Sequence, residues 1–255
     1  MIDEGALTQF LFITARMSGF VLFNPILGRQ NIPGNFRAGF ILVLSVFTYS
    51  VTGGRADIPP MATALLVSML LELVLGFVLG MVVSIFFYIP QLAGHAIDTQ
   101  MGMTMSQIYD SGSQSNMSVT GVLLNTMMTL LFFAANGHHT LLRIIITSGE
   151  VVAYGGVSIG PNVADAMLKL FVECTLLAVK LCMPILAAEM IGQLGMGVLM
   201  KVIPQINVFS INIELKVLVG LGLLFILMVP ISEYLIEAER MMLNSLHELL
   251  LLTAE

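Results

Sequence analysis

The chain has 255 residues, of which 57% are hydrophobic and only 10% are charged, whereas soluble domains carry roughly a quarter of charged residues. This composition excludes an ordinary soluble domain and is typical of a membrane protein, and the net charge of -6 argues against nucleic acid as a partner. The length suits one integral unit, so we expect a single domain over residues 1–255.

Several apolar stretches predict helices, because they are continuously hydrophobic and do not alternate as the strands of a membrane barrel do. The first is interrupted only by Arg16, and the others contain no Asp, Glu, Lys, Arg or His. Each approaches or exceeds the roughly 17 residues that cross a hydrocarbon core. The stretches are 5–27, 38–54, 73–94, 117–137 and 217–232. The expected fold class is therefore all-α, built from membrane-class helical hairpins.

Interior prolines predict that some of these helices bend. Proline lacks a backbone donor and clashes with the preceding turn, which membrane helices tolerate where neighbouring protein or a water-lined cavity satisfies the freed carbonyl. The prolines within or at the edge of the apolar helices are Pro90, Pro184, Pro204 and Pro230. We therefore expect bent helices that pack on other protein.

The segment 155–161, GGVSIGP, reads as a turn that separates two halves of the chain. We expect Asn162 to cap a helix that begins near Val163. In the first half, Gly76 and Gly80 are four positions apart, a spacing that allows two helices to approach closely.

Charged residues of the helix predicted over 163–187 share one narrow stripe, because at 100° per residue they fall within about 80° of one another. Near mid-membrane each charge costs roughly 2.5–3.5 kcal/mol, whereas each large aliphatic residue returns only about 0.3–0.6 kcal/mol. The stripe is either a solvated face with i,i+4 ion pairs or, as we prefer, a face that meets a polar partner or an aqueous lumen. The charges predicted to lie in the membrane or to face a lumen or partner are Glu72, Asp98, Arg143, Asp165, Lys169, Glu173 and Lys180.

Catalytic and metal-binding patterns are weak in this sequence. His95 and Asp98 are three apart and could share a helix face, but no third or fourth ligand has matching spacing. His138 and His139 are adjacent, about 100° apart on a helix, and cannot easily point at one metal ion. The sequence contains no nucleotide-binding or hydrolase motif. We therefore expect no enzyme, no cofactor and no metal site.

One polar segment interrupts the apolar stretches: 109–121 reads YDSGSQSNMSVTG. Gly112 and Gly121 supply backbone freedom, and the Ser, Gln and Asn residues between them tolerate either water or protein. By composition alone the segment is either a connector between helices or a loop with a function of its own.

Particular strings resemble the FliR family of flagellar export-gate proteins, which has the SctT-type subunits of virulence systems as relatives. The strings occur in the family's order over nearly the whole chain: RMSG at 16–19, NP at 24–25, GHAIDTQMG at 94–102, NGHH at 136–139 and PQINVF at 204–209. The resemblance implies a non-enzymatic subunit of the type III protein export gate, in which several subunits pack into one helical channel.

The resemblance also implies partners, a location and a plug. The partners are FliP-like and FliQ-like channel subunits, FlhB-like and FlhA-like export components, and unfolded flagellar substrates in transit. Residues 1–155 would be the FliP-like portion and 162–255 the FliQ-like portion. The location is the bacterial inner membrane at the flagellar basal body, with much of the protein above the bilayer plane. Family members carry a channel-plugging loop, which matches 106–122 here. The residues that would form the plug are Ser106, Gln107, Tyr109, Asp110, Ser111, Gly112, Ser113, Gln114, Ser115, Asn116 and Met117.

Two other functions stay open at this stage. A proton-coupled or small-molecule transporter would use Glu72, Asp98 and Lys180, and the helix breaks at the prolines fit that class. A membrane hydrolase would use His95 with Asp98.

The last predicted helix, 231–252, is amphipathic. Its apolar face consists of Leu235, Ala238, Met242, Leu246 and Leu249, and its polar residues are Glu237, Arg240, Asn244 and Glu248. Such a helix suits docking on a neighbouring subunit or at the membrane interface.

Overall fold

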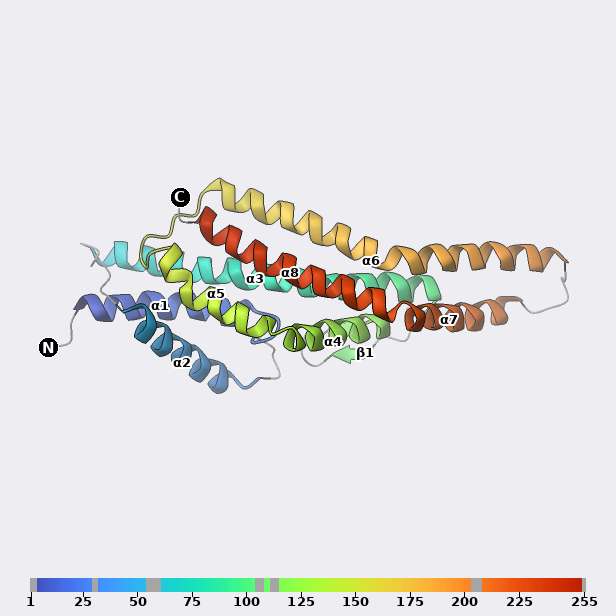
Figure 1. Cartoon of the computed structure of the whole chain (residues 1–255), viewed down its shortest axis with the longest axis horizontal. Helices are drawn as coiled ribbons and strands as arrows, with labels where there is room; N and C mark the ends of the chain where they lie inside the picture. Colours follow the sequence, from blue (N-terminus) through green and yellow to red (C-terminus); the bar gives the residue numbers. More distant parts are fainter. Residues whose placement is uncertain are drawn as a thin grey trace. The chain divides into compact units, whose positions relative to one another are not determined.

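The computed structural model describes residues 4–28, 32–53, 61–103, 108–110, 115–202 and 208–253, with the backbone alone for 108–110, 115–117 and 208–213. In these ranges the regular secondary structure is helical apart from one short hairpin (Figure 1). The helices are α1 (Glu4–Phe23), α2 (Gly34–Thr52), α3 (Ala62–Met101), α4 (Val119–Ala134), α5 (Gly137–Val151), α6 (Pro161–Val202), α7 (Val208–Ile226) and α8 (Met228–Leu252). The strands are β1 (Ile108–Asp110) and β2 (Ser115–Met117). The predicted helical class is confirmed, while the assembly with other subunits stays a prediction.

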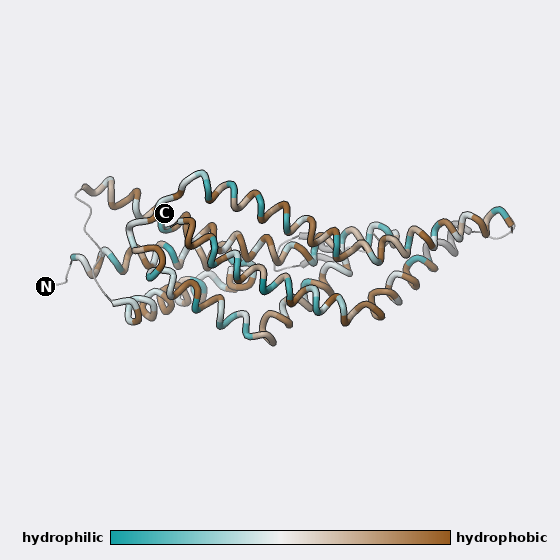
Figure 2. The backbone as a smooth tube through the Cα atoms, turned by 45° about the horizontal axis from the view of Figure 1, so that its top comes forward, coloured by the Kyte–Doolittle hydropathy of each residue, from teal (hydrophilic) through white to brown (hydrophobic). Residues whose placement is uncertain are grey.

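Helices α1, α2, α3 and α6 are each long and apolar enough to cross a membrane. The count among the described residues rises from 4 to 6 if the bent pairs α4 with α5 and α7 with α8 are each one span. Figure 2 shows the hydrophobic residues spread along the length of these helices and interrupted only at intervals by hydrophilic ones. The membrane class that the composition predicts is therefore carried by the helices themselves.

The interior prolines differ in their effect. Neither Pro90 in α3 nor Pro184 in α6 ends its helix. The segments Glu214–Ile226 and Met228–Leu252, by contrast, meet at a bend of 63°. Pro230 has no N–H to donate to the carbonyl of Ile226, four residues earlier, so the ladder loses a bond where the bend lies. The predicted bend at Pro230 is confirmed, and Pro204 lies outside the described residues.

The start of α6 corrects one detail of the sequence analysis. The helix begins at Pro161, so Asn162 is already inside the first turn and is not its cap. Proline suits the first helical position, because its missing N–H would have no partner there and its φ angle is already helical.

The described chain forms two compact units that alternate along the sequence. The first unit comprises Met1–Phe86, Asn136–Val172 and Glu239–Glu255, and the second comprises Phe87–Ala135 and Glu173–Ala238. The predicted division at 155 and 162 into FliP-like and FliQ-like portions rests on resemblance to whole proteins and stays a prediction.

In the first unit, α1 packs closely on the first half of α3. A Cβ built on Gly76 would lie 2.1 Å from the carbonyl oxygen of Arg16, and one built on Gly19 would lie 2.2 Å from that of Leu73. Glycine at both positions therefore lets the two backbones touch, as the Gly76 and Gly80 spacing predicts. Beside this contact, the rings of Phe23 and Phe77 meet edge to face, with centroids 4.5 Å apart.

In the second unit, the rest of α3 packs on α4 by the same device. A Cβ on Gly94 would lie 2.3 Å from the backbone nitrogen of Gly121. The rings of Phe87 and Phe132 pack edge to face with centroids 5.8 Å apart. Between α8 and α6, the Tyr234 hydroxyl donates a hydrogen bond to the carbonyl of Leu177 at 3.0 Å. Of these contacts, that of Gly94 with Gly121 joins the second half of α3 to the start of α4, where the chain returns from the hairpin.

The apolar face predicted for α8 is buried, as expected for an amphipathic helix. Every residue of that face is at most 2% exposed, and the polar residues predicted on the other faces are exposed. The apolar face is thus already covered by the chain itself, which makes it unsuitable for docking on a neighbouring subunit or at a membrane interface in this conformation.

Candidate functional site: a hairpin between two helices and a buried ionic cluster

The predicted plug segment is a β-hairpin at its core. Strands β1 and β2 pair antiparallel, with Ile108 opposite Met117, Tyr109 opposite Asn116 and Asp110 opposite Ser115. The predicted plug residues Ser106, Gln107, Ser111, Gly112, Ser113 and Gln114 lie outside the described residues. The segment therefore has more regular structure than its composition alone predicts, because backbone pairing needs no apolar side chains.

The hairpin is shorter than the segment 106–122 that the resemblance implies. Ser118 is the N-cap of α4, where its Oγ accepts a hydrogen bond from the Gly121 backbone N–H at 3.0 Å. Residues 119–122 are therefore the first turn of a helix. The sequence predicts that Gly121 supplies loop freedom, and this prediction is wrong: Gly121 lies in the first turn of α4 and is a buried contact point for Gly94.

Asp98 lies at the base of this hairpin. Its side chain is 2% exposed, and its Oδ2 accepts a hydrogen bond from the backbone N–H of Thr120 at 3.1 Å. Thr120 belongs to the first turn of α4, where N–H groups lack partners inside the helix and the helix dipole favours a negative charge. His95, by contrast, is exposed, so the structure does not pair it with Asp98 in one pocket.

A second polar site lies inside the first unit, where Arg16 and Glu72 form an ion pair. Nε of Arg16 donates to Oε2 of Glu72 at 2.6 Å, and Nη2 donates to Oε1 at 3.1 Å. Both side chains are 0% exposed. Glu72 thus has a partner from its own chain, while its predicted role at a lumen or partner in an assembly stays a prediction.

The same ion pair holds the connection that follows α5. Arg16 donates from Nη1 to Oγ of Ser148 at 3.0 Å and from Nη2 to the carbonyl of Val152 at 3.1 Å. The backbone N–H of Gly155 donates to Oε1 of Glu72 at 2.7 Å. Each charged group therefore binds the ion-pair partner and the α5–α6 connection at once, as buried charges require.

Tyr154 closes this cluster. The guanidinium carbon of Arg16 lies 4.4 Å from the centre of the Tyr154 ring, within the range of a cation–π contact. Burial raises the pKa of the Tyr154 phenol above its ordinary value, against the nearby Arg16 charge, which lowers it. The phenol is therefore neutral at physiological pH.

The remaining predicted charges are exposed, namely Arg143, Asp165, Lys169, Glu173 and Lys180. Among the described residues no ion pair joins the members of the α6 stripe, so the i,i+4 pairs of the solvated-face interpretation do not form here. Their neighbours on α6 include Leu168, Phe171 and Leu176, which are also exposed. The contact of this stripe with a polar partner or an aqueous lumen stays a prediction.

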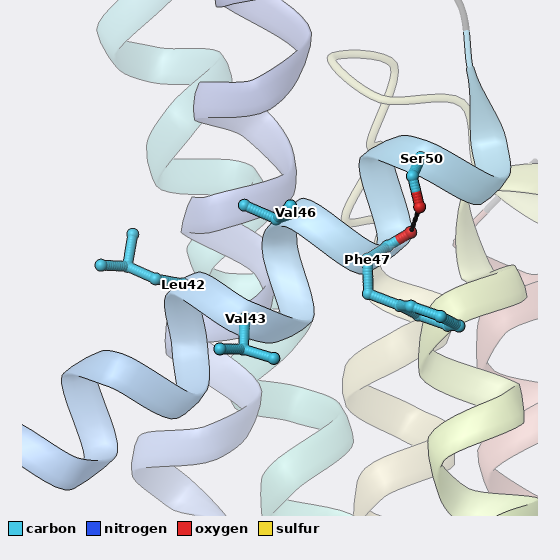
Figure 3. Close-up of a pocket in the computed structure, with 5 residues that line it drawn as sticks. All are labelled: Leu42, Val43, Val46, Phe47 and Ser50. Carbon is cyan, nitrogen blue, oxygen red and sulfur yellow. Dashed lines mark hydrogen bonds between the residues drawn. The ribbon is translucent and has the colours of Figure 1, made fainter.

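An apolar face of α2 is also exposed. Figure 3 shows the side chains of Leu42, Val43, Val46 and Phe47, all from α2, lining a shallow hollow together with Ser50. The hydroxyl of Ser50 donates back to the carbonyl of Phe47 at 2.7 Å, so the hollow offers almost no free polar group. It has the chemistry of a helix face for lipid or protein, and it lacks the polar groups of a catalytic pocket.

Arg16 was not predicted from the sequence as the partner of Glu72. A single arginine in the first apolar stretch was the available signal, because a charge in such a place needs a partner. Ser148, Val152 and Gly155 carried no signal, since a hydroxyl or a backbone group in a connection can bond almost anything.

In the part of the chain that the structure describes, no group of three or more His, Cys, Asp or Glu residues could hold a metal ion. Cys174 and Cys182 are free and buried, as their separation on one helix predicts. Fold and site together define a membrane-class helical protein with a hairpin anchored between two of its helices.

Comparison with known proteins identifies the family. Residues 7–241 match the family model described as bacterial export proteins, family 1, and the chain belongs to this family. It is 27% identical to the flagellar biosynthetic protein FliR of Bacillus subtilis, over 86% of this chain and 85% of that protein. It is 24% identical to FliR of Escherichia coli, over 89% and 87% of the two chains. It is 26% identical to the Yop proteins translocation protein T of Yersinia pestis, over 85% and 84%.

The family match confirms the resemblance drawn from the sequence strings. The chain is an export protein of the FliR and YscT family of flagellar and type III secretion systems, whose members are not enzymes. The hydrolase alternative with His95 and Asp98 is therefore dropped.

Proposed function

We propose that the chain is a channel subunit of the flagellar type III export gate, through which unfolded substrates leave the cell. The observation that carries the proposal is the family match over residues 7–241, together with similarity to FliR proteins along nearly their whole length. The proposed location is the bacterial inner membrane at the flagellar basal body, with much of the assembled protein above the bilayer plane.

The exposed apolar helices support a role inside an assembly. Only 17% of the apolar window of α2 and 28% of that of α6 are buried within the chain. Soluble monomers rarely leave such continuous apolar surfaces uncovered. The exposed charges of α6 would be costly against lipid, which favours protein or water on that face. We propose FliP-like and FliQ-like subunits as the neighbours that cover these faces, with FlhB-like and FlhA-like components nearby.

The hairpin is the proposed plug of this channel. Its strands are short, with three residues each, and a two-stranded hairpin of that size is marginally stable by itself. It can therefore give way to an emerging chain and pair again afterwards. The helices on either side are fixed by the contact of Gly94 with Gly121, so the movement would be confined to the hairpin.

Complementation of export tests this function. The chain is expressed in a flagellated bacterium that lacks its own FliR-family gene, and flagellar proteins in the medium are measured with the empty vector as a control. A tag on the chain then shows whether FliP-like and FliQ-like subunits co-purify. We expect restored export and co-purification, and failure of both while the chain accumulates in the membrane would contradict the proposal.

The transporter alternative has its own test. The purified chain alone is reconstituted into liposomes, and proton flux is recorded with a pH-sensitive dye. A channel subunit without its companions should give no more flux than empty liposomes. Flux that is abolished by Lys180→Met, with the protein still inserted, would favour the transporter.

A further inference from the structure

The two ends of the hairpin segment are held close to one residue, Asp98. The segment leaves α3 after Met101 and re-enters a helix at Val119. Gly102, with φ of 80°, turns the chain out of α3, a backbone angle that favours glycine. The contacts that hold these two ends relative to each other therefore determine the position of the hairpin between them.

Asp98 bonds both ends at once. Its backbone carbonyl accepts a hydrogen bond from the N–H of Met103 at 2.8 Å, where the segment leaves. Its side-chain Oδ2 accepts a hydrogen bond from the N–H of Thr120 at 3.1 Å, where the segment returns. The exit bond uses only the backbone and forms with any residue, so the aspartate side chain is needed for the return bond alone.

The surroundings make this bond well defined. Asp98 and Thr120 are each 2% exposed, so water does not compete for the donor. Ser118 satisfies the next N–H of the same helix end, that of Gly121, which leaves the Thr120 N–H to the carboxylate. The close approach of Gly94 and Gly121 brings α3 near enough to α4 for the short aspartate side chain to reach.

The bond is also a single one. Among the described residues, Oδ1 of Asp98 has no hydrogen-bond partner although it is buried. The side chain therefore contributes one charge-assisted hydrogen bond to the return end of the hairpin, beside the backbone contact of Gly94 with Gly121. The loss of that bond weakens the hold on this end and leaves the helix contact in place.

We propose that Asp98 is the positioning residue of the hairpin: its carboxylate ties the first turn of α4 to α3 and so sets the resting place of the plug. The link to channel closure rests on the proposed function, whereas the tie between the two helix ends does not. The inference gives Asp98 a role different from that of a charge facing a lumen or a transported proton.

The tie itself is tested by hydrogen exchange on the full chain in detergent. Asp98→Ala removes the acceptor, and Asp98→Asn keeps a side-chain oxygen that can accept from Thr120. Thr120→Pro removes the donor and leaves Asp98 intact, because proline is tolerated in a first helical turn. Thr99→Ala is the matched control, since the exposed Thr99 hydroxyl donates to the His95 carbonyl of its own helix and to no other group among the described residues.

We expect amide exchange in residues 118–124 to rise by about tenfold in Asp98→Ala, as loss of a hydrogen bond to a charged group implies. Thr120→Pro should raise the exchange of the Gly121 and Val122 amides. Asp98→Asn should stay within a few fold of the parent chain, and Thr99→Ala should match it. Unchanged exchange in both Asp98→Ala and Thr120→Pro would overturn the inference, and Thr120→Pro provides the answer if Asp98→Ala does not accumulate.

The link to closure is tested in cells that hold the companion subunits. Ion leakage through the inner membrane is compared among Asp98→Ala, Asp98→Asn and a deletion of 111–116. We expect leakage in the deletion and in Asp98→Ala, while the subunits assemble normally. Asp98→Asn should restore a closed channel. Leakage in the deletion alone would overturn the positioning role in closure. No leakage in the deletion would instead overturn the proposed plug, and the tie would still be decided by the exchange rates.

Discussion

Arg16 and Glu72 are 56 positions apart in the sequence, yet they form a bidentate ion pair in which neither side chain is exposed. The pair also holds Ser148, Val152 and Gly155. It therefore connects two transmembrane-class helices, α1 and α3, with the connection that leads into α6. Within the first unit, the cluster therefore links three segments that are far apart in the sequence.

The first prediction concerns this pair. Arg16→Met or Glu72→Leu alone leaves a buried charge without its partner, which costs about 3–5 kcal/mol. The double variant should be less destabilised than the sum of the two, because no lone charge remains. Thermal unfolding in detergent measures this, with Arg143→Met as the exposed control expected to lie within about 0.5 kcal/mol. Additive effects of the two single variants would contradict the coupling.

The second prediction concerns the helix contact beside the pair. Gly76→Ala puts a methyl group 2.1 Å from the Arg16 carbonyl, which is backbone and cannot turn away, so α1 and α3 must separate at a cost of about 1–3 kcal/mol or more. Gly39→Ala meets open space and should be neutral or slightly stabilising, since alanine favours helix. The two variants are compared by their abundance in the membrane and by their melting temperatures. Equal values for both variants would show that the close contact does not form.

The third prediction concerns pH. Burial raises the folded-state pKa of Tyr154 above the ordinary value of 10.0, so the unfolded chain loses this proton first as pH rises. The stabilisation is complete below about pH 10 and is lost as pH rises through the folded-state pKa. Tyr154→Phe keeps the ring over Arg16 but cannot ionise. Its melting temperature should therefore fall less than that of the parent chain between pH 9 and pH 11, and parallel curves would contradict the assignment.

Much of the fold follows from the local sequence. Uninterrupted apolar stretches long enough to span a membrane can satisfy their backbone groups only as helices, so every predicted stretch is helical over most of its length. The helices α3 and α6 run well beyond the predicted ranges, α5 was not predicted, and the stretch 217–232 is divided between α7 and α8. Pro230 marks the bend before α8 because it removes one specific ladder bond. Gly76 and Gly80 indicate a close helix contact because only glycine permits one.

The pairing of distant residues does not follow from the sequence in the same way. Gly76 predicts a close contact, but Gly19 is identified as the other side only by the structure. Arg16 needs a partner, and nothing local distinguishes Glu72 from the other acids. The polar segment 109–121 contains turn-forming residues but no alternating apolar pattern, so strand pairing there carried no signal. These features depend on tertiary packing, and the local pattern of one sequence considered by itself does not show which distant residues pack together.

The fourth prediction concerns movement of the hairpin. Tyr109 and Asn116 are directly opposite, and opposed antiparallel residues have Cα atoms about 4.5–5.5 Å apart, within the range that a disulfide spans. In Tyr109→Cys/Asn116→Cys an oxidant should lock the strands, lower export by about tenfold or more, and allow full recovery on reduction. The native Cys174 and Cys182 are buried and should not interfere.

The single variant Tyr109→Cys is the control for this experiment and should be insensitive to the oxidant. Disulfide formation is read from the mobility of a proteolytic fragment. Normal export with a fully formed disulfide would mean that the hairpin need not open for substrates to pass.

The central claim is that the segment between α3 and α4 closes an export channel, and deletion of residues 111–116 tests it most directly. In cells with the companion subunits, ion leakage across the inner membrane and export of flagellar proteins are measured together, after the assembly has been checked by co-purification. The account predicts raised leakage with export retained. Unchanged leakage in a normally assembled gate would contradict it and reduce the hairpin to a connector between two helices.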